Sequence, residues 1–170
     1  MSPKSFLLPT IYSVLLIIAT SITFYGGYTQ HMNKVTIIGW LLIIPFCVFA
    51  MLYSKKVNYN NTIGGKDAVK EGLKFIIFST IILVIFQAIF FELDFKAYKI
   101  NFIQTYGLEL AKAQVKNGNL KITEAQLPDL INQEIAQVTL FKECTSIVFK
   151  NLFLGTITSI ITAVTLRAKF

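Results

Sequence analysis

Four long apolar runs, separated by polar segments, set the pattern of this sequence. Each run is close to the roughly 20 residues that an α-helix needs to cross about 30 Å of hydrocarbon. The pattern predicts an all-α integral membrane protein, with four transmembrane helices in a single membrane domain over residues 1–170. The predicted spans cover approximately residues 6–25, 35–53, 75–91 and 146–166.

The longest polar region, residues 92–145, lies between the third and fourth predicted spans. We expect a first helix here over residues 101–115. It is expected to end at the Asn117-Gly118 pair, because glycine just after a helix is a common stop signal. The predicted fold therefore includes a helical loop between the third and fourth spans.

A second helix is predicted to follow, starting near Thr123 and Gln126, since Thr followed three residues later by Gln is a capping signal. Apolar residues recur at three-to-four spacing over residues 127–141, so one face of this helix is apolar. No Gly or Pro stands in residues 129–154, and we expect the helix to run directly into the fourth span. The preceding helix is expected to cover the apolar face through Leu108, Leu110, Ala111 and Val115.

Residues 54–74 form the only strongly basic polar stretch between two apolar runs. Lys66, Lys70 and Lys74 recur every four residues and therefore share one face of a helix that leads into the third span. A basic face beside a span can bind anionic lipid headgroups, or it can dock a cytoplasmic partner protein. The predicted contact residues are Lys55, Lys56, Lys66, Lys70 and Lys74.

The distribution of basic residues predicts the orientation in the membrane. The ends of the chain carry Lys4, Arg167 and Lys169, and the 54–74 stretch carries five lysines, whereas the first hairpin turn carries only Lys34. Cytoplasmic segments are enriched in Lys and Arg. Both termini are therefore expected in the cytoplasm, with the helical loop outside.

Small residues recur along the fourth predicted span. Gly155, Ser159 and Ala163 stand four residues apart, and they form a smooth stripe on which another helix can pack closely. We therefore predict that these three residues lie in a helix–helix contact.

Lys150 is the only charged residue inside a predicted span. It lies about one turn from the outer end, so its ammonium can reach the interface by snorkelling. The alternative is a buried ion pair, for which Glu92 or Asp94, at the end of the third span, is the expected partner. The sequence leaves both interpretations open.

Composition narrows the possible functions. The net charge of +7 favours anionic lipids over nucleic acid, because Arg167 is the only arginine and the lysines cluster beside apolar spans. His31 has no Cys or carboxylate at ligand spacing, and Cys47 and Cys144 fall in or beside different spans, toward opposite faces, so neither a metal site nor a disulfide is expected. No catalytic set and no phosphate-binding loop is present. We therefore expect no cofactor and no enzymatic activity.

Two short segments carry a resemblance to a known family: GKDAVKEGLKF, which leads into the third span, and FELDF, at its end. With the four spans and the helical loop, they resemble the bacterial inner-membrane family called domain of unknown function 4199, over nearly the whole chain. Ala68 and Gly72 match small residues of the family's segment, and Asp94 matches its acidic position. The resemblance implies an inner membrane of a Gram-negative, Bacteroidota-type bacterium, with the loop in the periplasm, and implies no activity.

These observations favour a non-catalytic accessory or scaffolding subunit of a larger inner-membrane protein complex. Its expected partners are other inner-membrane proteins and anionic lipids. The alternative is a small transporter or flippase for a lipid-linked or anionic substrate, with Lys150 and the cytoplasmic lysines available to hold a phosphate. A proton-coupled exporter is disfavoured, since the first three spans contain no carboxylate.

Overall fold

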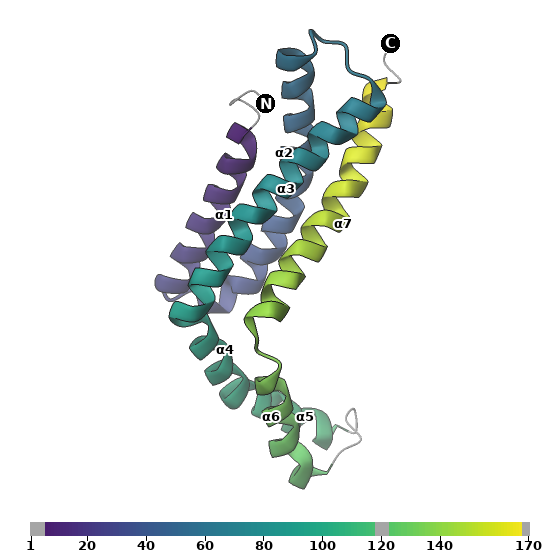
Figure 1. Cartoon of the computed structure of the whole chain (residues 1–170). Helices are drawn as coiled ribbons and strands as arrows, with labels where there is room; N and C mark the ends of the chain where they lie inside the picture. The colour runs from purple at the N-terminus through teal and green to yellow at the C-terminus, as the bar shows by residue number, and fades with distance from the viewer. Residues whose placement is uncertain (1–5, 118–122, 168–170) are drawn as a thin grey trace. The chain divides into compact units, whose positions relative to one another are not determined.

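The computed structural model describes residues 6–117 and 123–167, and every regular element in these two ranges is a helix (Figure 1). Long α-helices alternate with short turns of 3-10 helix (η2, η5) and π-helix (η3, η4). In chain order the elements are α1 (Leu7–Tyr25), η2 (Thr29–His31), α2 (Met32–Asn58), α3 (Gly65–Phe90), η3 (Phe91–Phe95), α4 (Lys96–Phe102), η4 (Ile103–Gly107), α5 (Leu108–Lys116), η5 (Glu124–Gln126), α6 (Leu127–Ala136) and α7 (Leu140–Arg167).

Four helical segments are long and apolar enough to cross a membrane. They begin at Leu7, Thr29, Gly65 and Leu140 and contain α1, α2, α3 and α7. The prediction of an all-α membrane protein with four transmembrane helices is therefore confirmed.

The chain divides into two compact units. Unit 1 consists of Met1–Phe86 and Ser146–Phe170, and it holds α1, α2 and most of α3 and α7. Unit 2 consists of Gln87–Thr145 and holds the shorter helices between them.

The core of unit 1 is built from one face of each long helix. Tyr12 of α1, Ile43 and Met51 of α2, and Phe75 and Ile76 of α3 are almost completely buried. The Tyr12 hydroxyl donates a hydrogen bond to the carbonyl of Gly39 at 2.9 Å, which satisfies its polar atom inside the bundle. Apolar side chains also cover much of the outer surface, as expected for helices that face lipid.

Polar side chains join the helices of unit 1. Asn151 Nδ2 donates to Thr80 Oγ1 at 3.2 Å, and Ser13 Oγ donates to the Ser79 carbonyl at 3.3 Å. Interhelical hydrogen bonds of this kind stabilise membrane bundles, because a polar group in hydrocarbon has no water to bind. The polar interior of unit 1 therefore connects its own helices.

The helix expected over residues 101–115 starts much earlier, so that prediction is wrong at its beginning. The helical segment that begins at Gly65 continues without interruption to Lys116, and Glu92 and Asp94 lie in the π-helical turn η3. Residues 73–106 contain no Gly or Pro, so nothing in the backbone stops the hydrogen-bond ladder. Gly118 of the predicted stop signal lies outside the described residues.

The expected continuous helix from the second loop helix into the fourth span is also wrong. α6 ends at Ala136, and α7 begins separately at Leu140. Thr139 provides the reason, because its hydroxyl accepts a hydrogen bond from the backbone N–H of Lys142 at 3.3 Å and so caps a new helix. Phe141 consequently leaves the apolar face of α6 and is 80% exposed.

α6 packs against η4 and α5 within unit 2. Leu127 and Ile131 of α6 and Ala111 of α5 are buried there, but Leu110, expected in the same contact, is largely exposed. The Thr123 backbone N–H donates to the Gln126 side chain at 3.0 Å across the 3-10 turn η5, and α6 begins directly after this turn at Leu127.

Candidate functional site

Glu71 is the most deeply buried charged side chain that the structure describes in unit 1. It lies in the second turn of α3, and only 6% of it is exposed. The last turns of α2 cover it, because Ser54 faces α3 there. A carboxylate in this position needs compensating donors, since burial of an unpaired charge is strongly unfavourable.

Donors converge on Glu71 from three directions. Ser54 Oγ donates to Glu71 Oε2 at 2.7 Å, the Tyr59 hydroxyl lies 3.5 Å from Oε1, and the Lys74 ammonium forms an ion pair with Oε1. Asn58 Nδ2 donates to Ser54 Oγ at 2.8 Å and holds that hydroxyl in place. We call these five residues the Glu71 cluster; it connects the end of α2 to the start of α3.

The surroundings of Tyr59 favour its protonated form. Burial, followed by the negative charge of Glu71, raises the pKa of the Tyr59 phenol above its ordinary value. Tyr59 therefore keeps its proton at neutral pH and acts as a donor to the carboxylate.

A small cavity of about 20 Å³ adjoins the cluster, and this volume is enough for one water molecule. Four cluster residues, Ser54, Asn58, Glu71 and Lys74, line it, so a water there would find several hydrogen-bond partners. The arrangement can hold a carboxylate, its donors and a water in fixed positions. The cavity is lined by Leu8, Ala50, Tyr53, Ser54, Asn58, Glu71, Lys74 and Phe75.

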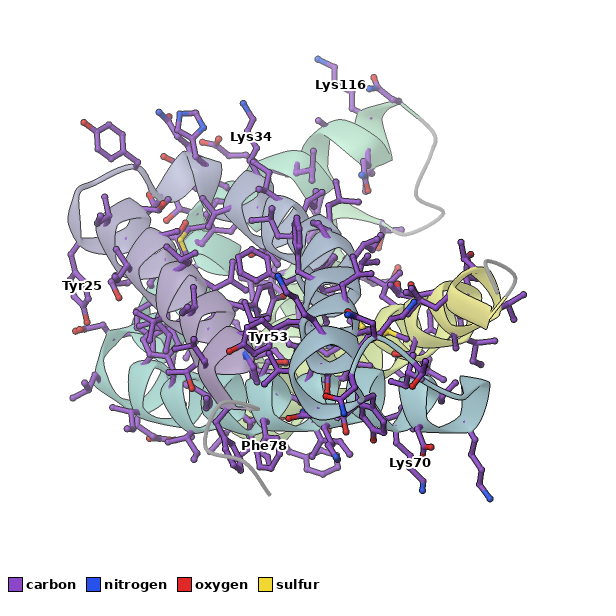
Figure 2. The ribbon with its side chains drawn as sticks, turned by 90° about the horizontal axis from the view of Figure 1, so that it is seen from above. Tyr25, Lys34, Tyr53, Lys70, Phe78 and Lys116 are labelled. Atoms are coloured by element: carbon purple, nitrogen blue, oxygen red, sulfur yellow. The ribbon has the colours of Figure 1, made fainter. Side chains whose placement is uncertain are left out.

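The structure separates the five lysines predicted as headgroup or partner contacts. Lys74 turns to Glu71, whereas Lys70 is exposed and pairs with Asp67 at 3.5 Å (Figure 2 shows Lys70 extending away from the helices). Lys56 and Lys66 are exposed, and Lys55 is partly buried. Of the five, Lys56, Lys66 and Lys70 are the most exposed.

The stripe of small residues faces the other helices of unit 1. A Cβ on Gly155 would collide with the side chain of Ile76, and Ser159 Oγ lies 3.4 Å from the sulfur of Cys47. Ala163 is buried. These three residues therefore lie where α7 approaches α2 and α3.

The two small residues taken from the family segment occupy the same contact region. Ala68 is completely buried, and Gly72 lies so close to Ser159 and Met51 that a side chain would not fit there. Their size lets α3 approach its neighbours.

Lys150 lies on an aromatic ring. Its ammonium is 3.8 Å from the ring centroid of Trp40, which is cation–π geometry between α7 and α2. Glu92 and Asp94 belong to unit 2, and their pairing with Lys150 stays a prediction.

Glu71 was not among the site residues predicted from the sequence. The one local signal was its position three residues before Lys74, which suits an i,i+3 ion pair.

His31 is exposed in η2, and in the described part of the chain no three His, Cys, Asp or Glu side chains gather. Both cysteines are free.

The four apolar helices and their buried polar contacts define a polytopic α-helical membrane protein. The chain belongs to the family described as protein of unknown function (DUF4199), whose model matches residues 8–168. No curated protein and no solved structure matches the sequence.

Proposed function

We propose that this protein is a non-catalytic accessory or scaffolding subunit of a larger bacterial inner-membrane complex. The observation that carries the proposal is an exposed apolar face on unit 2. Phe102, Tyr106 and Leu110 stand four residues apart, and they are 49%, 60% and 62% exposed. The rings of Phe102 and Tyr106 lie 5.2 Å apart, so the two aromatic residues form one surface.

A protein partner fits this face better than a charged lipid surface. Unit 2 carries six lysines and seven acidic residues, so it offers little net attraction to anionic headgroups. Exposed apolar patches on a polar helical region usually mark a contact with another molecule, and aromatic residues are enriched in protein interfaces. The proposed partner is an inner-membrane protein with an apolar face of its own.

The interior of unit 1 supports a structural role. Its polar side chains bind one another across helices, as in the pairs Asn151–Thr80 and Ser54–Glu71. Buried polar side chains that hydrogen-bond across helices favour one packing arrangement of the helices over others. A scaffold needs this property, because its docking surfaces must keep a fixed position.

Replacing both Phe102 and Tyr106 with Ser should weaken partner association while the fold persists. Truncation of an interface aromatic typically costs about 2 kcal/mol, so recovery of the partner in a mild-detergent pull-down should fall at least about tenfold. The matched control is Gln104→Ser, an exposed change in the same segment. Equal recovery of stoichiometric partners with all three proteins would contradict the proposal.

We also propose that both termini are cytoplasmic and that unit 2 is periplasmic. The support is the excess of lysine in the segment between α2 and α3 over the single Lys34 of the first turn. Lys4 and Lys169, which add to this excess, lie outside the described residues.

Cysteine labelling tests this orientation in a background with Cys47 and Cys144 changed to Ala. A membrane-impermeant maleimide applied to the periplasmic side should label a cysteine at Asn117 and miss one at Asn60. The reverse labelling pattern would overturn the orientation.

One observation supports the alternative function, a small transporter or flippase for a lipid-linked or anionic substrate. Lys150 places a positive charge in α7, within a helix apolar enough to span the membrane. Purification distinguishes the two proposals, since a homo-oligomer that carries a lipid-linked sugar and no other protein would favour transport.

A further inference from the structure

Lys150 and Trp40 form a half-buried pair on unit 1, far along the chain from the lysines of the α2–α3 connection. The Lys150 ammonium stands over the indole face at 3.8 Å from the ring centroid. A cation–π contact stabilises the charge, more strongly where water is scarce. It supplies no oxygen acceptor for the three N–H groups of the ammonium.

No carboxylate pairs with Lys150 in the described part of unit 1. The sequence places only two acidic residues in this unit, Asp67 and Glu71, and they pair with Lys70 and Lys74. In the described part of unit 1, no oxygen accepts a hydrogen bond from the Lys150 ammonium. An ammonium in an apolar helix is stabilised by an anionic acceptor, which for Lys150 would come from outside the described part of unit 1.

Apolar side chains surround the pair on the outer surface of both helices. Phe153 lies one turn beyond Lys150 on α7 and is exposed, and its ring stacks with that of Phe149 at 6.1 Å. Ile37 and Ile44 stand one turn before and one turn after Trp40 on α2, and both are exposed. A ligand that contacts this region should combine an anion with hydrocarbon chains.

We propose that Lys150 and Trp40 hold the phosphate of an anionic phospholipid whose acyl chains lie along α2 and α7. The lipid phosphate accepts charge-assisted hydrogen bonds from the ammonium, and the indole positions the ammonium for them. Trp40 lies near the N-terminal end of α2, whereas Lys70 and Lys74 lie at the start of α3, beside the C-terminal end of α2. It is thus separate from the headgroup contacts predicted for the α2–α3 connection, and it does not depend on the partner proposal.

Native mass spectrometry of the full chain in mild detergent tests the proposal. Phosphatidylglycerol is titrated against diacylglycerol with the same acyl chains, which lacks the phosphate. We expect wild-type protein to bind one phosphatidylglycerol about tenfold more tightly than diacylglycerol, as suits a charge-assisted hydrogen bond. Lys150→Met should remove this preference, and Trp40→Phe should reduce it severalfold.

Two further variants separate a lost site from a lost fold. Lys150→Arg keeps the charge and should keep the preference, and Lys34→Met removes an exposed lysine of α2 and should leave it unchanged. An unaltered preference in Lys150→Met, or equal binding of both lipids by wild-type protein, would overturn the proposal. Complete displacement of phosphatidylglycerol by millimolar inorganic phosphate would overturn the lipid assignment and identify a site for free phosphate.

Discussion

Replacing Lys74 with Met should lower the apparent free energy of unfolding by about 2–3 kcal/mol, because it removes the cation that pairs with the buried carboxylate of Glu71. The expected loss lies somewhat below the ~3–5 kcal/mol typical of a broken buried pair, since Lys74 itself is partly exposed. Titration of purified protein from mild detergent into SDS, followed by far-UV circular dichroism, measures the difference.

The chain contains its own control for this prediction. Lys70 and Asp67 form an ion pair with the same i,i+3 spacing on the same helix, but both side chains are well exposed. Lys70→Met should therefore change stability by no more than about 1 kcal/mol. Glu71→Gln added to Lys74→Met should recover part of the loss, because the uncompensated charge disappears. Equal effects of Lys70→Met and Lys74→Met would show that burial of Glu71 does not matter.

Gly155→Leu should destabilise unit 1 by about 3 kcal/mol, at the upper end of what overpacking of a close contact usually costs. Even a single Cβ at Gly155 would collide with Ile76, a buried residue of α3. α7 must therefore move away from α3 to accommodate the larger side chain, and the neighbouring contact of Ser159 with Cys47 moves with it. A thermal unfolding curve in detergent should show the shift.

Ile157→Leu provides the matched comparison on the same helix. Ile157 is exposed on the outer surface of α7, and its replacement should leave thermal stability within about 0.5 kcal/mol of the wild type. If Gly155→Leu were tolerated equally well, the stripe of small residues would have no role in packing.

Features of the fold that depend on residues close together in the chain could be predicted from the sequence. Apolar runs of membrane-spanning length predicted the four long helices, and the Thr123–Gln126 pair stands at the turn η5 directly before α6. The break between α6 and α7 has only a weak local signal. Thr139 caps α7 without any Gly or Pro, so the break after Ala136 was not expected.

The candidate site depended on contacts between residues distant in the sequence. Ser54 and Glu71 are 17 residues apart. The sequence around a polar residue near a charged loop does not indicate which face of its helix will be buried. The Lys70 and Lys74 side chains looked equivalent for this reason, although one is exposed and the other pairs with Glu71.

By itself, the sequence determined the number of membrane helices and the family, because hydrophobic length and local segments are readable without a partner. Tertiary structure alone decided that Glu71 becomes a buried acceptor and that Lys150 of α7 lies on Trp40 of α2. The physical reason is that the environment of a charged side chain is set by the helices packed around it. Which faces of those helices meet is a property of the whole bundle.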